Sequence, residues 1–238
     1  MNFQANLIAG MDEAGRLRHG AVSAAGASVG AGAGATASKR GSDGGADEAG
    51  ESLIAGIDEA GRGCWAGAVY AAAVILPLGH GLVGLRDSKK LSALQRQRLS
   101  VQIREKAAAW AVASADAGEV DALNILRASL QAMRRAVQAL AITPDECWVD
   151  GLHAPALACP VRTFVRGDDQ HPAIMAASIL AKVARDTDMI EQDARFPGYG
   201  FARHKGYGTA QHRVALRRLG LCPLHRRSFA PVAAELPT

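Results

Sequence analysis

Acidic residues follow three short apolar runs of the sequence, at positions where carboxylates can converge. Asp58 and Glu59 come directly after LIAGI, Asp150 ends ECWVD, and Asp168 follows VRTFV. If these runs are strands of an open α/β sheet, their carboxyl ends meet at the edge where ligands bind. Clustered carboxylates repel one another unless a cation neutralises them, and oxygen ligands suit Mg²⁺ or Mn²⁺. The pattern therefore indicates a candidate site for metal-dependent phosphodiester hydrolysis.

Two observations keep a purely structural interpretation of these acids open. A single acidic residue after a strand is more often an ordinary turn or capping residue than a ligand. In addition, consecutive strand residues point to opposite faces, which separates the side chains of Asp58 and Glu59. Both can serve only if the chain leaves β geometry there, or if one acts through its backbone carbonyl. Gly61 and Gly63 make such a departure plausible.

The ten residues that carry Asp58 and Glu59 occur almost identically near the N-terminus. LIAGMDEAGR occupies residues 7–16, and LIAGIDEAGR occupies residues 53–62. The first copy has Leu17 where the second has Gly63, and it runs into the Gly-, Ala- and Ser-rich residues 20–50. Such a stretch buries too little apolar surface to offset its ordering entropy. We predict that residues 1–52 are a disordered extension with a partial motif duplicate, and that residues 53–238 form one catalytic domain.

The charge of the chain is mildly basic overall but unevenly distributed. The formal net charge is +4 over 238 residues, which permits an acidic partner without requiring one. No acidic residue lies between Asp193 and Glu235, a segment that holds eight basic residues: Arg195, Arg203, Lys205, Arg213, Arg217, Arg218, Arg226 and Arg227. A merely solvated surface usually interleaves both signs, so this segment favours nucleic-acid binding.

Cysteine usage and hydropathy exclude several classes of protein. The four cysteines form no CxxC pair, which argues against a zinc site and indicates reduced thiols. We see no signal-peptide pattern, and the longest apolar run, residues 66–76, is too short to span a bilayer. We therefore expect a soluble, cytoplasmic protein that does not contact membranes.

Periodicity predicts an α/β domain with a mixed sheet. Five strands are expected at residues 53–57, 66–77, 109–115, 146–150 and 161–165. Helices are expected after the N-cap Ser92, from about Glu119 to Leu140, from Pro172 to about Ala194, and from the N-cap Thr209 to Leu219.

Seven motifs between Leu53 and Phe229 resemble those of ribonuclease HII. In order, they are GIDEAGRGCWAGAVYAAAVIL, DSKKLS, VDG, RGD, AASILAKVARD, YGFARHKGYGT and HRRSF. The resemblance implies a ribonuclease H-like fold, with a mixed central sheet flanked by helices and a C-terminal helical part. It also implies an endonuclease that cuts the RNA strand of RNA/DNA hybrids and single ribonucleotides embedded in duplex DNA, leaving 5′-phosphate and 3′-hydroxyl ends.

The resemblance also assigns the acidic residues. The family's four catalytic carboxylates correspond to Asp58, Glu59, Asp150 and Asp168, and it implies that they bind two divalent ions, Mn²⁺ or Mg²⁺, with the first three named as metal ligands. Asp169 follows immediately and could take the last position, but the family's lysine-glycine-aspartate pattern favours Asp168.

Substrate contacts carry over in the same way. The family's Gly-Arg-Gly, which contacts the 2′-hydroxyl side of the substrate, matches Gly61, Arg62 and Gly63, and its junction-reading tyrosine matches Tyr207. The chain departs from the family at Cys64-Trp65, where Pro-Leu is usual, and at Ala68, where proline is usual. These departures put the geometry of the loop in doubt more than the activity.

A polar stripe is expected on the helix that starts at Pro172. Ser178, Lys182 and Arg185 lie at i, i+4 and i+7, hence on one face. Taken alone, the stripe could be a solvated face, whereas the resemblance favours contacts with backbone phosphates. His204 and His212 lack metal-ligand spacing and are expected near the surface.

The expected partners are RNA/DNA hybrids and ribonucleotide-containing duplex DNA, bound by a monomer. Two other functions remain in comparison with this one. A resolvase-like nuclease acting on DNA alone has no use for Arg62 and Tyr207 as ribose-reading groups. A non-catalytic nucleic-acid-binding module would have lost some of the four carboxylates, and all four are present.

Overall fold

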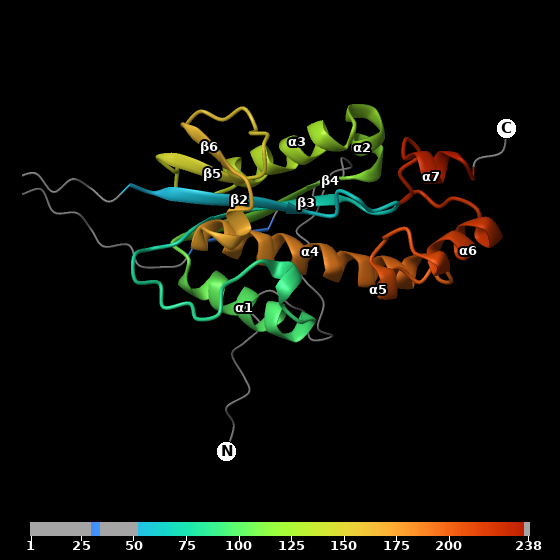
Figure 1. The fold of residues 1–238 in the computed structure, drawn as a ribbon, viewed down its shortest axis with the longest axis horizontal. Coiled ribbons are helices and arrows are strands. Elements are labelled where there is room, and N and C mark those ends of the chain that lie inside the picture. Colours follow the sequence, from blue (N-terminus) through green and yellow to red (C-terminus); the bar gives the residue numbers. More distant parts are fainter. Residues whose placement is uncertain (1–29, 34–51, 236–238) are drawn as a thin grey trace, which may run out of the picture.

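A six-stranded mixed sheet forms the centre of the protein (Figure 1). This computed structural model describes residues 30–33 and 52–235. The strand order is β1-β4-β3-β2-β5-β6. β2 (Ile54–Ala60), β3 (Val69–Ile75) and β4 (Ala109–Ala115) are antiparallel neighbours, while β5 (Glu146–Asp150) and β6 (Val161–Phe164) continue from β2 in parallel. The mixed sheet predicted from the sequence is confirmed.

Both faces of the sheet are covered by helices, which explains why β3 is buried along its whole length. α3 (Ile125–Gln138) covers one face, and α4 (Pro172–Arg195) with α1 (Ala93–Lys106) covers the other. Alanines in β3 and β4 leave room for close approach. Gly56 of β2 lies so close to α4 that a Cβ at this position would overlap the backbone of Ala173. The start of α4 is thereby held directly on the strand that carries Asp58.

Local signals place most helix ends where the sequence predicts them. α1 begins after Ser92 with a capping box, in which the Ser92 hydroxyl and the Gln95 side chain each accept from the other's backbone N–H. α4 has proline at its first position and ends at Arg195. α6 (Ala210–Leu219) is capped by Thr209 and ends before Gly220.

The single helix predicted from Glu119 to Leu140 is wrong. The chain forms α2 (Ala117–Leu123) and then α3, with a break at Asn124. Asn124 has a φ of 68°, outside the helical region, and its side chain accepts from the backbone N–H of Arg127 as an N-cap. The apolar periodicity continues across the break, so the pattern concealed it.

Short elements join the C-terminal segment to the end of α4. α5 (Phe201–His204), α6 and α7 (Ala230–Ala233) follow in order, and a small core forms around Met189, Tyr199 and Phe201. A β-bridge between Ala66 and His225 ties this part to the loop after β2. The expected C-terminal helical part is therefore present, and it adjoins the catalytic sheet (Figure 1).

Within the segment predicted to be a disordered extension, four residues form a strand. β1 (Gly30–Ala33) pairs antiparallel with β4 at the edge of the sheet. Backbone hydrogen bonds make such a pairing without apolar side chains, so composition does not reveal it. The rest of the predicted extension, including the first motif copy with Asp12 and Glu13, lies outside the described residues. Among the described helices, none has the length and apolarity needed to cross a membrane.

Candidate active site

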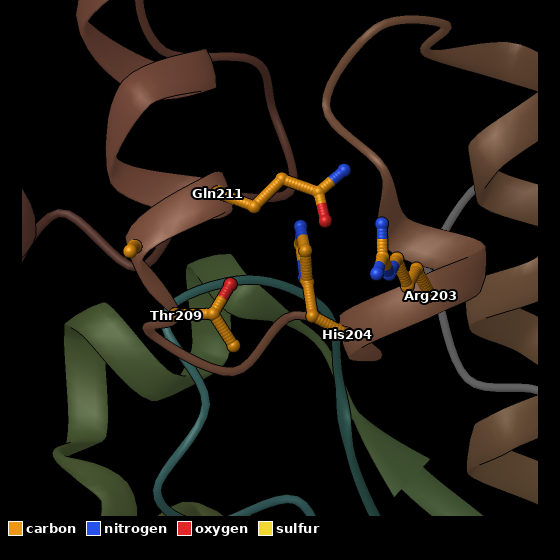
Figure 2. Close-up of a pocket in the computed structure, with 5 residues that line it drawn as sticks. Arg203, His204, Thr209 and Gln211 are labelled. Atoms are coloured by element: carbon orange, nitrogen blue, oxygen red, sulfur yellow. The ribbon is translucent and has the colours of Figure 1, made fainter.

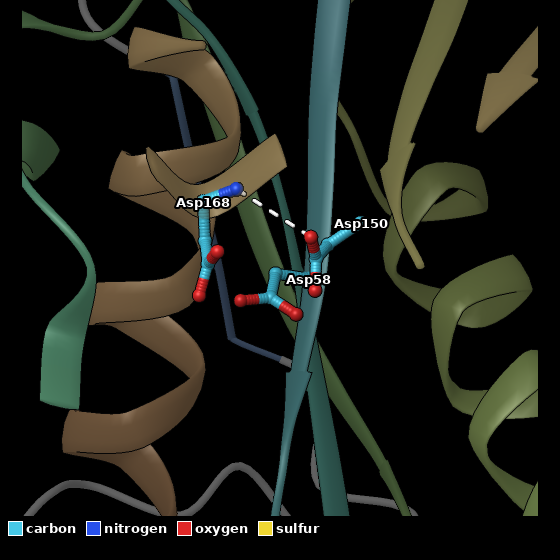
Figure 3. Close-up of side chains that lie close together, drawn as sticks. All are labelled: Asp58, Asp150 and Asp168. Atoms are coloured by element: carbon cyan, nitrogen blue, oxygen red, sulfur yellow. Dashed lines mark hydrogen bonds between the residues drawn. The ribbon is translucent and has the colours of Figure 1, made fainter. Parts of the chain in front are cut away.

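Three carboxylates meet at the carboxyl ends of β2 and β5 (Figure 3). One oxygen from each of Asp58, Asp150 and Asp168 lies within 4.8 Å of the others. β2 and β5 are parallel, and Ile57 pairs with Val149, so the next residues of the two strands, Asp58 and Asp150, point to the same side. The predicted convergence of these three side chains is confirmed.

A tight turn, rather than a strand end, brings Asp168 into the group. β6 ends at Phe164, and Asp168 lies in a short 3₁₀ helix, η2 (Gly167–Asp169). Arg166 turns the chain with a φ of 59°, and the Gly167 N–H donates to Asp150 Oδ1 at 2.7 Å. A Cβ at Gly167 would lie 2.7 Å from the terminal methyl of Ile174, so a larger residue here would require that side chain to move. The prediction that Asp168 closes a strand is corrected accordingly.

Asp169 faces away from the cluster. Its carboxylate pairs with Lys90 and, at 3.0 Å, with Arg166. Of these two neighbouring aspartates, only Asp168 lies beside Asp58 and Asp150, in agreement with the family's lysine-glycine-aspartate pattern.

Glu59 does not join the three aspartates. β2 continues through Ala60, so the chain keeps β geometry and the side chain of Glu59 alternates to the other face. Its Oε1 accepts from Arg62 Nη1 at 3.2 Å, and its buried Oε2 has no hydrogen-bond partner. The anticipated departure from β geometry is wrong, because Ala71 and Tyr70 of β3 still pair with Glu59 and Ala60.

The electrostatics of the cluster favour a bound cation. Burial, with the charges of Glu59 and Asp150, raises the pKa of Asp58 well above its usual value. Burial and the charge of Asp150 also raise the pKa of Asp168. Among the described residues, the ion pairs of these three aspartates reach only Lys89, whose exposed Nζ lies 3.5 Å from Asp168 Oδ2. A divalent ion between the carboxylates would offset both the burial of their charges and their mutual repulsion, which together raise these pKa values.

The Gly-Arg-Gly segment follows directly after β2. Gly61 has a φ of 97°, and a Cβ there would overlap Nε of Arg185. Arg62 is half-exposed beside Glu59, and its carbonyl accepts from Nη1 of the buried Arg226 at 2.8 Å. Gly63 has open space around its Cα.

The polar stripe predicted on α4 is largely buried. Ser178 is buried, with its hydroxyl 2.8 Å from that of Ser88 and within hydrogen-bond reach of Asp58. Arg185 is fully buried, and only Lys182 reaches the surface, where it pairs with Asp186 at 2.6 Å. The structure does not support the predicted direct phosphate contact from Ser178 or Arg185, because this face of α4 packs against the protein rather than facing solvent.

Tyr207 lies beside the same face of α4. It is 43% exposed, and its ring lies 5.7 Å from Lys182 Nζ and 5.8 Å from the Arg185 guanidinium. The Cys64 thiol is hydrogen-bonded to its side chain, and burial raises the pKa of the tyrosine hydroxyl. Cys64, one of the three residues at which the chain departs from the family, thus lies beside the tyrosine that the family resemblance singles out.

Sequence reasoning missed the histidine cluster and an adjoining open pocket. His204 and His212 are buried rather than exposed, and their rings stack at 4.5 Å. The pocket, of about 540 Å³, lies at the start of α6; Figure 2 shows Arg203, His204 and Gln211 pointing into it. The sequence feature that pointed to this region was the absence of acidic residues between Asp193 and Glu235.

Comparisons with known proteins agree with this geometry. The family model described as "Ribonuclease HII" matches residues 55–232. A protein named ribonuclease HII from Bordetella pertussis is 59% identical over 183 residues, covering 77% of this chain and 91% of its own. One from Dichelobacter nodosus is 56% identical over 184 residues, covering 77% of this chain and 97% of its own.

Solved structures include one of the same fold. The crystal structure of the ribonuclease H2 from Pyrococcus horikoshii superposes with a TM-score of 0.67, covering 76% of this chain and 96% of that one. The two sequences are 22% identical, so this likeness concerns the fold.

Proposed function

Because the chain belongs to the ribonuclease HII family, we propose that it hydrolyses the RNA strand of RNA/DNA hybrids and cuts at single ribonucleotides embedded in duplex DNA. The chain is an endoribonuclease, a hydrolase of phosphodiester bonds. The proposed products carry 5′-phosphate and 3′-hydroxyl ends. The observation that carries the proposal is the convergence of Asp58, Asp150 and Asp168 next to the Gly61–Arg62–Gly63 segment.

The carboxylate cluster fits divalent ions by its chemistry. Three aspartate oxygens within 4.8 Å offer hard ligands, and a single lysine provides partial neutralisation. We propose that Asp58, Asp150 and Asp168 hold Mg²⁺ or Mn²⁺, two ions during catalysis. Glu59, the fourth family position, would contribute through its backbone carbonyl, because its side chain lies outside the cluster. When bound, the ions supply the positive charge that activates the attacking water and stabilises the leaving oxygen.

The chain's own residues position these groups and the substrate. The Gly167 N–H orients Asp150 through Oδ1. The Ser178 hydroxyl of α4 lies near Asp58 and lowers its pKa, against the larger raising effect of burial. Glu59 Oε1 holds the guanidinium of Arg62 at the loop that faces the ribose. Lys182 is the residue of the α4 stripe that can meet a backbone phosphate, after exchanging its partner Asp186.

Ribose recognition is assigned to Gly61, Arg62, Gly63 and Tyr207. A ribonucleotide in DNA differs from its neighbours by one hydroxyl, so the groups that read it must touch it. Gly63, with open space where a Cβ would stand, lets the backbone approach that hydroxyl, while Gly61 packs against the buried Arg185. Tyr207 offers a half-exposed ring to the sugar or base beyond the cut. We propose that the protein acts as a monomer in the cytoplasm.

The decisive assay uses three duplexes, each with and without Mg²⁺ or Mn²⁺. They are an RNA/DNA hybrid, a DNA duplex with one ribonucleotide, and the same duplex in DNA alone. The proposal expects cleavage of the first two only, and only with a divalent ion. Cleavage of the all-DNA duplex would identify a DNA nuclease, and tight binding without cleavage would identify a non-catalytic module.

A binding measurement tests the ion site independently of turnover. Mg²⁺ or Mn²⁺ at 100 times its dissociation constant should raise the free energy of unfolding by about 2.7 kcal/mol, because it binds the folded chain only. Asp58→Asn should abolish most of this gain. An equal gain in the variant would place the ion elsewhere.

A further inference from the structure

Arg185 is completely buried, but only one of its three guanidinium nitrogens donates a hydrogen bond. Its Nη2 donates to the carbonyl of Ala66 at 3.2 Å, while Nε and Nη1 have no hydrogen-bond partner. No carboxylate of the described residues forms an ion pair with it. A buried charge in this state costs stability. The contacts that it makes therefore need a reason other than stability.

Three glycines from two loops lie against this one guanidinium. Gly61 and Gly67 belong to the loop that follows β2, and Gly206 belongs to the loop before α6. A Cβ at Gly61 would overlap Nε, and a Cβ at Gly206 or Gly67 would lie 3.3 or 3.7 Å from Nη2. The guanidinium thus fills the space that a side chain at Gly61 would need and packs close to Gly206, where the nearest obstacle to a Cβ is the Ala66 carbonyl.

The same two loops carry the groups assigned to ribose recognition. Arg62 follows Gly61, and Tyr207 follows Gly206. The Gly206 carbonyl accepts from the backbone N–H groups of Trp65 at 2.8 Å and Ala66 at 3.3 Å, so the loops are joined directly. The ring of Tyr207 lies 5.8 Å from the Arg185 guanidinium. Arg185 therefore contacts both loops from α4.

We propose that Arg185 is a positioning residue, which sets the distance between Arg62 and Tyr207 and thereby the selectivity for a single ribonucleotide. The inference rests on the proposed function and refines how its substrate is recognised. Arg185 does this through packing and one carbonyl hydrogen bond, without touching nucleic acid, because its side chain has no exposed surface.

The planar shape of arginine matters for this role. A planar guanidinium can pack against the backbone of several glycines at once and can also lie near a tyrosine ring. A lysine ammonium is instead a compact charge on a flexible stem. Arg185→Lys would keep the charge and lose the plane. A role in attracting phosphate would be restored by lysine, and a role in positioning would not.

The experiment measures single-turnover cleavage of two substrates at fixed salt and Mn²⁺: a DNA duplex with one ribonucleotide and a hybrid with a long RNA tract. The ratio of the two rates is the readout. In Arg185→Met and Arg185→Lys it should fall roughly 100-fold, the loss typical of about 1 Å of misplacement at a reacting group. Arg134→Met, an exposed arginine of α3 on the opposite face of the sheet, should leave the ratio unchanged.

Two further measurements separate positioning from other roles. Arg185→Met combined with Tyr207→Ala should have no lower ratio than Tyr207→Ala alone, because both changes act through one contact. The salt dependence of hybrid affinity should stay unchanged in Arg185→Met, whereas Lys182→Ala should reduce its slope by about one counterion.

Equal loss on both substrates, an unchanged ratio, or a reduced salt slope in Arg185→Met would overturn the inference. Thermal unfolding of each variant identifies one that fails to fold, and Arg185→Lys then supplies the same readout. Failure of the wild-type protein to cut the ribonucleotide-containing duplex would instead overturn the proposed function. Wild-type cleavage with an unchanged ratio in Arg185→Met and Arg185→Lys would overturn only the role of Arg185.

Discussion

At the scale of single residues, the division of labour follows from what each side chain touches. Asp58, Asp150 and Asp168 face one another and repel, so their arrangement has little structural benefit without a cation. Asp169, adjacent in sequence to Asp168, is satisfied by Lys90 and Arg166. Asp169 is therefore a suitable control for substitutions of the aspartates in the cluster.

Asp150→Asn should lower turnover on an RNA/DNA hybrid by at least about 100-fold, since even changes around a metal ligand cost that much. Hybrid affinity should be kept, because Asp150 is half-buried and its carboxylate accepts from the backbone of Gly167 beside the other two aspartates. Asp169→Asn is the matched control and should retain turnover. Cleavage rates and equilibrium binding measured on the same substrate check both expectations; equal losses of turnover in the two variants would contradict the assignment.

At the scale of elements, a single residue, Asn124, separates α2 from α3. Asn124 has a φ of 68° and a ψ of 163°, a region that costs non-glycine residues energy, and its side chain caps α3. The break lets α2 and α3 run in different directions while the apolar pattern remains continuous.

Asn124→Ala should lower the free energy of unfolding by about 1 kcal/mol, the usual value of a lost N-cap, since the strain at positive φ remains. Asn124→Gly should lower it less, because glycine loses the cap but relieves the strain. Urea unfolding of the three proteins gives the order. Alanine as stable as asparagine would mean that the cap contributes nothing here.

The histidine cluster makes the C-terminal part sensitive to acid. His212 Nε2 lies 3.1 Å from His225 Nε2, and the His204 ring stacks on His212. Burial lowers the pKa of His212 from 6.5 to about 4, and it also lowers the pKa values of His204 and His225. The folded state thus holds neutral rings where the unfolded chain would bind protons.

Stability from this cluster should be fully present above pH 6.5 and should be lost as pH falls toward 4, because only the unfolded chain takes up protons in that window. Each such group contributes a slope of up to about 1.4 kcal/mol per pH unit. His212→Gln should be less stable at neutral pH but should have a shallower acid slope. Urea unfolding between pH 4 and 7 measures it; an unchanged slope would exclude His212 as a source.

At the scale of the whole molecule, the sheet and the turn after β6 supply the acids, and the C-terminal part packs against the loop after β2. The buried Arg226 donates to the carbonyls of Arg62 and Gly67, so a residue near the C-terminus holds the loop after β2. The ribose-reading region therefore depends on segments more than 150 residues apart, as the separation of 164 between Arg226 and Arg62 illustrates.

Deletion of residues 1–50 should leave turnover intact, because the described active site draws on Asp58 and later residues. The deletion removes β1 and exposes the edge of β4, so self-association at high concentration should increase. Cleavage assays and light scattering measure the two effects. Lost turnover in a folded deletion variant, or in Asp12→Asn with Glu13→Gln, would give the first motif copy a catalytic part.

The sequence by itself determined five strands of the sheet and most of the long helices, and it placed Asp58 and Asp150 at strand ends. Short apolar runs marked the strands, Ser92, Pro172 and Thr209 marked helix starts, and the ordered motifs indicated the family. These signals are local: a capping hydroxyl or a fixed φ acts within one turn of the chain. The same locality explains the miss at Asn124, where one residue interrupts an otherwise continuous period.

Only the tertiary structure decided what each polar face meets. Helical spacing put Ser178, Lys182 and Arg185 on one face of α4, but burial by the sheet and two loops left only Lys182 at the surface. Likewise the turn at Arg166, not the spacing, selected Asp168 over Asp169. Periodicity reports the direction of a side chain relative to its own element, whereas exposure depends on which distant segments pack there. That information is spread over the whole chain.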